Sequence, residues 1–319
     1  MKRHPLLAYF ALTFGLTWGL GACFAMFSVQ LTAVFGKLSV TNPLFILAVY
    51  APSISAIIVS GLVDGPAGVR RLLGGFLRWR IGIQWYVAIF VGIPMLSAIA
   101  MVLSAALTRT PLVVDPWYQL FLLGPSGKQI VRAAGAGGVW SVIPAVLGSF
   151  LADPGPLGEE LGWRGFALPR LLENRSALSA GVILGVIWGV WHLPAFILAG
   201  TPQNNMSFPL FMIGIVALSV LMTWAYKGTS GSVLAAVLIH WTFNTCTDMT
   251  RMPLALFSVG VLVITVAVVV AVAGPGLSDQ GNTKATLSPA ESDDRAPRSN
   301  DALLTSAASE QYWTGRRRR

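Results

Sequence analysis

The stretch 158–166, GEELGWRGF, places two adjacent acids and an arginine in a chain that otherwise avoids charge. Residues four apart share a helix face, so Glu160 and Arg164 are expected to form an ion pair with the acid in the favourable N-terminal position. Glu159 lies about 100° further round the same helix and is left for chemistry. Apolar neighbours keep the basicity of such a carboxylate high, so that it can act as a general base near neutral pH.

Two of the three histidines also interrupt apolar stretches, His192 in VIWGVWHLPAF and His240 in VLIHWTFNT. Asn244 follows His240 by four residues, so the imidazole and the carboxamide are expected to project together. Trp188 precedes His192 by the same spacing and is expected to pack on its ring. A carboxylate that activates water, with His and Asn donating to an oxyanion, is what hydrolysis of a peptide bond requires.

Each of these residues also has a plain structural interpretation. Glu160 and Arg164 could be an ion pair that holds a helix end, and a membrane histidine or Asn244 could make hydrogen bonds between helices. For metal, no HExxH sequence is present, which is the helical zinc signature. We expect no metal and no other cofactor; the alternative is a zinc ion held by Glu159, His192 and His240.

The composition is that of an integral membrane protein. Of the 319 residues, 55% are hydrophobic and 11% are charged, and the mean hydropathy is +0.68, whereas soluble domains carry about 25% charged residues. A span needs about 20 apolar residues. We predict an all-α, polytopic transmembrane helix bundle of about eight spans, at 6–27, 43–63, 85–107, 139–168, 177–198, 209–226, 231–248 and 254–273. The fourth is a helix broken by DPGP at 153–156.

The distribution of basic residues predicts that both termini are cytoplasmic. The net charge of +9 therefore reflects membrane orientation and does not indicate nucleic-acid binding. We expect a multi-pass protein, in a bacterial cytoplasmic membrane, whose partners are membrane lipids and a membrane-associated protein or peptide substrate. The bundle is predicted to occupy 1–275, with the motifs in about 139–248. The stretch 68–80 is expected to be an interfacial helix, and 276–319 a disordered cytoplasmic tail.

The predicted spans raise one difficulty of depth. Glu159 is expected near the inner face of the membrane, whereas His192 is roughly 22 Å along its span at 1.5 Å per residue. The two side chains can meet only if the broken segment re-enters the membrane or if the span with His192 begins outside it.

Three motifs resemble the signatures of the CPBP family of intramembrane proteases. EELGWR at 159–164, WGVWH ending in His192 and HWTFN beginning at His240 match the family patterns EExxxR, FxxxH and HxxxN/B in that order. The family includes type II CAAX prenyl endopeptidases and bacteriocin-processing or self-immunity proteins. Trp188 departs from the pattern, because it stands where the family usually has Phe; an aromatic ring is kept, and a narrower pocket is expected.

The resemblance implies a role for each matched residue. Glu159 would be the general base that activates water, and His192 would assist or orient that water. His240 and Asn244 would form the oxyanion hole, while Glu160 and Arg164 would support these groups.

The leading hypothesis is therefore a glutamate-dependent intramembrane endopeptidase. A second hypothesis is an ion or solute pathway that uses the same buried polar groups; no internal repeat of the kind common in transporters is visible. A third is a non-catalytic immunity or scaffold protein with the same fold.

Overall fold

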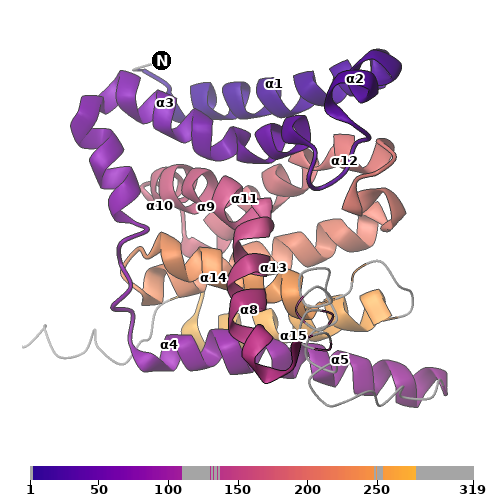
Figure 1. Ribbon diagram of the computed structural model, residues 1–319. Coiled ribbons are helices and arrows are strands. Elements are labelled where there is room, and N and C mark those ends of the chain that lie inside the picture. The colour runs from indigo at the N-terminus through magenta and orange to yellow at the C-terminus, as the bar shows by residue number, and fades with distance from the viewer. Residues whose placement is uncertain are drawn as a thin grey trace, which may run out of the picture. The chain divides into compact units, whose positions relative to one another are not determined.

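The computed structural model describes residues 3–109, 130, 132, 135, 137–247, 249 and 254–277, all within the compact unit Met1–Asp279. In these ranges the regular elements are helices and there is no strand (Figure 1), which confirms the all-α prediction. Of the tail expected at 276–319, residues from 278 onward lie outside the described ranges. The helices are α1 (Pro5–Met26), α2 (Ser28–Phe35), α3 (Pro43–Gly74), α4 (Ile83–Val87), α5 (Ile93–Thr108), α8 (Val142–Ala152), α9 (Pro154–Gly162), α10 (Leu168–Leu172), α11 (Ala177–Trp191), α12 (Leu193–Ile197), α13 (Phe208–Gly228), α14 (Val233–Cys246) and α15 (Leu254–Ala273).

The long apolar helices follow the predicted spans closely. In the described part of the chain, five are long and apolar enough to cross a membrane: Pro5–Met26, Pro43–Gly74, Ile83–Thr108, Phe208–Gly228 and Leu254–Ala273. Three shorter apolar helices, α8, α11 and α14, fall within the other predicted spans. The protein is therefore a polytopic helical membrane protein, and the number and orientation of its spans stay predictions.

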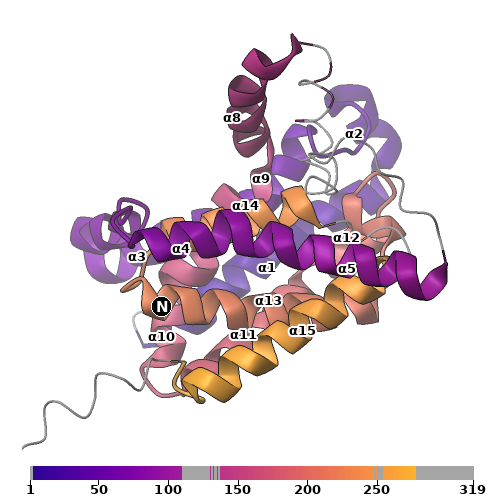
Figure 2. The same cartoon turned by 90° about the horizontal axis from the view of Figure 1, so that it is seen from below.

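At the helix break predicted at DPGP, one helix, α8, ends and a new one, α9, begins. Asp153 has an extended backbone (φ −86°, ψ 103°), and its side chain accepts a hydrogen bond from the Gly155 amide. Pro154 follows at the first helical position, where its missing N–H is no loss. This cap separates α8 from α9, and Figure 2 shows α8 projecting away from the other helices. The break therefore frees α9 to enter the bundle in its own direction.

The stretch expected to be an interfacial helix at 68–80 is helical only in its first part. The helix α3 continues to Gly74, and 75–80 form turns and irregular chain. A kink at Gly65 (φ 66°, ψ −163°) divides α3, at a backbone conformation that glycine adopts without strain. The expectation of one helix over all of 68–80 was therefore wrong, since the chain turns at Gly75 to reach α4.

Two glycines allow α9 to lie directly on α3. Gly158 and Gly162 are four apart and therefore share one face of α9. A Cβ on Gly158 would lie 3.0 Å from the carbonyl oxygen of Val49, and one on Gly162 only 2.5 Å from that of Pro52. Small residues permit such close backbone approach between membrane helices. Because this face is fixed against α3, the acids of α9 must point elsewhere.

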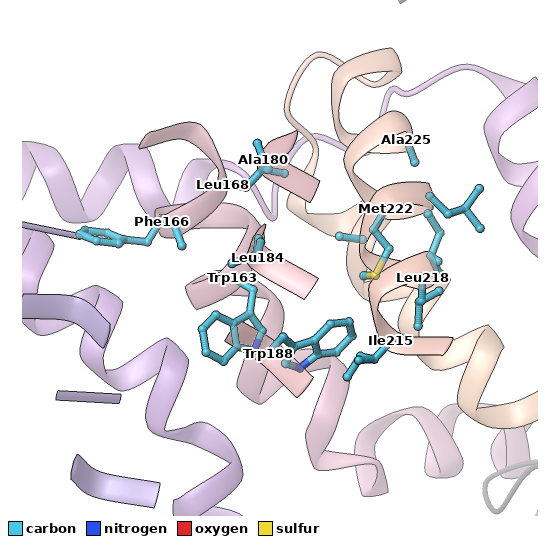
Figure 3. Close-up of a cluster of buried hydrophobic side chains, with 14 of the residues drawn as sticks. Trp163, Phe166, Leu168, Ala180, Leu184, Trp188, Ile215, Leu218, Met222 and Ala225 are labelled. Atoms are coloured by element: carbon cyan, nitrogen blue, oxygen red, sulfur yellow. The ribbon is translucent and has the colours of Figure 1, made fainter. Parts of the chain in front are cut away.

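The helix that ends directly before His192, α11, is held against α13 in the same manner. A Cβ on Gly185 would lie 2.8 Å from the Cα atom of Val216. Around this contact is the main buried cluster, which includes the indoles of Trp163 and Trp188 and the side chains of Leu184 and Met222 (Figure 3). The core thus fixes the ends of α9 and α11 relative to α13.

Candidate active site

One cavity contains all four residues predicted to be catalytic. It has a volume of about 260 Å³, and Glu159, His192, His240 and Asn244 line it. The separation by depth that the span count suggested does not occur. Because α9 begins afresh at Pro154 and α11 ends at Trp191, Glu159 and His192 reach the same space.

Glu160 makes the ion pair that its spacing predicts. Arg164 Nη1 lies 3.0 Å and 3.1 Å from the two carboxylate oxygens, and both side chains are fully buried. The other side of the carboxylate faces α14, where His240 Nδ1 lies 2.8 Å from Oε1. Glu160 therefore links α9 to α14 through its hydrogen bond with His240, while Arg164 neutralises its charge. With these partners, Glu160 holds the helices in place and is not available to accept a proton from water.

Glu159 has a different environment. Its Oε2 accepts hydrogen bonds from two indoles, Trp188 Nε1 at 2.6 Å and Trp163 Nε1 at 3.4 Å. Among the described residues, no Lys, Arg or His forms a salt bridge with it. The side chain is 4% exposed and borders the cavity. Glu159 is thus a carboxylate beside open space with only neutral hydrogen-bond donors.

The hydrogen bonds of His192 fix its tautomer. Its Nδ1 lies 2.8 Å from the carbonyl oxygen of Trp188, and a carbonyl only accepts, so Nδ1 carries the hydrogen. In the neutral ring Nε2 therefore has a lone pair that can accept a hydrogen bond from water. The ring centroids of Trp191 and Phe211 lie 4.7 Å and 5.0 Å away, nearly perpendicular, whereas that of Trp188 is 6.0 Å away. The expected packing by Trp188 is thus the loosest of the three.

His240 is oriented by its hydrogen bond to Glu160. The carboxylate of Glu160, which Arg164 holds in place, accepts a hydrogen bond from Nδ1 of His240. Nδ1 therefore carries a hydrogen, and Nε2 points away from Glu160 and Arg164. Nε2 can donate to an oxyanion only when the ring is an imidazolium, and the buried carboxylate of Glu160 favours that charge. The ring of Trp188 packs edge-on against His240 at 5.4 Å.

Asn244 is fixed by a residue that the sequence reasoning missed. Its Nδ2 donates to Asp153 Oδ2 at 3.1 Å, while Asp153 Oδ1 caps α9 through the Gly155 amide. One carboxylate thus begins the helix of Glu159 and orients the amide of Asn244. DPGP was recognised as a helix break, but its acid was not assigned to the site.

Gly155 leaves space where several polar atoms converge. A Cβ at this position would lie 3.2 Å from Glu159 Oε1, 3.4 Å from Asp153 Oδ1 and 3.4 Å from His240 Nε2. The oxygen of Glu159 that faces this space is Oε1, the one to which neither indole donates. The absence of a side chain at Gly155 therefore keeps the approach to Oε1 open.

No group of three or more His, Cys, Asp or Glu side chains in the described part of the chain is placed to hold a metal ion. The alternative zinc ligands, Glu159, His192 and His240, line one cavity without forming such a group. Cys23 and Cys246 are both free thiols.

The segment that contains these residues also resembles known proteins. Residues 130–246 match the family model described as type II CAAX prenyl endopeptidase Rce1-like, and this match includes all three motifs. The predicted resemblance to the CPBP family is confirmed. The chain is also similar to "CAAX prenyl protease 2" of Methanococcus maripaludis, with 28% identity over 92 residues. That alignment covers 27% of this chain and 34% of the relative, so the similarity spans about a third of the relative's length.

Proposed function

We propose that the protein is an intramembrane endopeptidase in which Glu159 activates the attacking water. The observation that carries this proposal is the contrast between the two acids of α9. Glu160 is paired with Arg164 and His240, whereas Glu159 borders the cavity, accepts hydrogen bonds from two neutral indoles and forms no salt bridge with a described residue. A carboxylate in that position retains the basicity that a general base needs. The family resemblance of the surrounding segment supports the same assignment.

The proposed reaction begins with a water molecule between Glu159 and His192. Oε1 of Glu159 takes one proton, Nε2 of His192 orients the water, and the oxygen attacks the scissile carbonyl carbon. The resulting oxyanion accepts hydrogen bonds from Nε2–H of His240 and from the amide of Asn244. The proton on Glu159 then passes to the leaving nitrogen, the C–N bond breaks, and a carboxylic acid and an amine form, which leave as a carboxylate and an ammonium once the second proton of the water has moved to the amine.

The cavity suits an apolar substrate segment. Its lining includes Leu20, Phe24, Leu44, Phe45 and Leu198, and such surfaces bind apolar groups through burial from water. Because the similar protein is named a CAAX prenyl protease, a farnesylated peptide ending in a CAAX sequence is the first probe. Membrane proteins with apolar C-terminal segments are the second.

Zinc is the alternative to this metal-free mechanism. If zinc is used, Glu159, His192 and His240 would hold it, and the ion would supply an activated water. The metal-free proposal predicts that cleavage persists after treatment with 1,10-phenanthroline and dialysis. Loss of cleavage that zinc restores would overturn the metal-free form.

The test compares the full chain with its Glu159→Gln variant in the same lipid. The readouts are cleavage of the farnesylated peptide in proteoliposomes and new C-termini among membrane proteins of cells that express each form. We expect cleavage products with the native chain and their loss with Glu159→Gln, at equal membrane insertion. Equal cleavage by the two forms would exclude Glu159 as the base. Identical C-termini in both cells, with no peptide cleavage, would instead favour the non-catalytic hypothesis.

A further inference from the structure

The two indoles at Glu159 both donate to the same oxygen. Trp188 is 1% exposed and Trp163 is fully buried, and they come from α11 and from the π-helical turn Trp163–Ala167 that follows α9. Figure 3 shows their rings next to each other. Both N–H groups are directed at Oε2, at 2.6 Å and 3.4 Å. The carboxylate is therefore asymmetric, with Oε2 occupied and Oε1 toward Gly155 and the cavity.

The rings themselves are held in place by neighbours. The guanidinium carbon of Arg164 lies 4.3 Å from the ring centroid of Trp188, a cation–π geometry. Tyr9 and Trp191 pack edge-on against Trp163 at 5.8 Å and 5.7 Å. Because both indoles are fixed before any substrate binds, so is the carboxylate that accepts their hydrogen bonds.

Position 188 departs from the family pattern. Trp188 stands where the family pattern has Phe, and a phenyl ring has no N–H to donate. The substitution of Trp for Phe therefore adds a hydrogen-bond donor 2.6 Å from the proposed base. The sequence led us to expect only that Trp188 narrows the pocket. Its hydrogen bond to Glu159 is a second consequence of this residue.

We infer that Trp188, assisted by Trp163, is a positioning residue that selects which oxygen of Glu159 takes the proton. Its N–H fixes Oε2, so that Oε1 alone receives the proton from water. A neutral donor is suited to this task because it orients the carboxylate without contributing the cationic partner that Glu160 has. The inference rests on the proposed function, since it assigns Trp188 a role through Glu159.

The experiment removes the N–H while keeping the ring. Trp188→Phe restores the family residue, and benzothienylalanine at position 188 keeps the bicyclic shape with sulfur in place of N–H. Both are expected to lower kcat about 10- to 100-fold with KM within about twofold, the loss expected for a hydrogen bond to a charged group. Trp163→Phe should lower kcat less, because its contact is longer. Trp224→Phe, on α13 against Trp85, is the matched control and should leave kcat unchanged.

A second measurement does not depend on turnover. In protein labelled with 15N-tryptophan, the indole signal of Trp188 is identified by its loss in either 188 variant. Glu159→Gln should move this signal more than any other indole signal, with Trp163 second. An unmoved signal, or a benzothienylalanine form with native kcat, would overturn the inference. Native activity of Glu159→Gln would instead overturn the proposed function, so the two failures are distinguishable.

Discussion

The two sides of α9 show how one helix places adjacent acids in opposite environments. On one side, Glu160 is fully buried and bound by Arg164 and His240. On the other, Glu159 borders a cavity, and its hydrogen-bond donors within the described part of the chain are the neutral indoles of Trp188 and Trp163. The first side joins α9 to α14 and the second faces the space where substrate would bind.

The difference shows that the chemistry at each acid depends on its partners rather than on its residue type. A buried carboxylate that pairs with Arg164 and accepts a hydrogen bond from His240 contributes to structure and orients that imidazole. A buried carboxylate with neutral donors keeps its capacity to accept a proton.

The largest effect on stability is expected on the side of Glu160. Arg164→Met would leave the carboxylate of Glu160 buried with only His240 as a charged partner. Breaking a buried pair by removing one member destabilises by about 3–5 kcal/mol, so we expect a large loss of folded protein, measured by thermal unfolding in detergent. The double variant Glu160→Gln/Arg164→Met should recover part of this loss because it removes both charges of the pair together. Native stability of Arg164→Met would contradict the structural role of the pair.

The next effect is expected at the oxyanion position. Asn244→Ala should lower kcat about 10²- to 10³-fold, because removal of one donor to an oxyanion has that effect in other hydrolases. The measurement is steady-state cleavage of the farnesylated peptide, with thermal unfolding as the control for folding. A change confined to KM would show that Asn244 binds substrate without stabilising the oxyanion.

A smaller effect is expected at Asp153. Asp153→Asn keeps a residue that caps helices well. However, its NH2 group takes the place of the carboxylate oxygen that accepts the hydrogen bond from Asn244. We expect kcat to fall about tenfold, the effect of one lost hydrogen bond to a charged group, with little change in thermal stability. An equal loss of stability and activity would indicate that Asp153 acts only as the cap of α9.

The sequence was sufficient to predict the all-helical class, most of the long helices and the ion pair on α9. Apolar runs of span length predict the long helices, and the spacing of four residues predicts the pair of Glu160 and Arg164. Three ordered motifs indicated which rare polar residues share a cavity.

Contacts between distant segments could not be predicted in the same way. The bond from Trp188 to Glu159 joins residues 29 apart, and that from Asn244 to Asp153 joins residues 91 apart. Both depend on the direction that α9 takes after its cap at Asp153, which no local periodicity specifies. The depth difficulty had the same origin, since a straight count of residues ignores a helix that begins anew.

The most direct test of the central claim measures Glu159→Gln and Glu160→Gln side by side, for turnover and for thermal stability. If Glu159 is the base, Glu159→Gln should lower turnover about 10²- to 10⁴-fold, while Tm stays close to that of the native chain. Glu160→Gln should lower Tm clearly, because Arg164 loses its buried carboxylate partner. Retained turnover in Glu159→Gln, or an unchanged Tm in Glu160→Gln, would contradict the division of roles between the two acids.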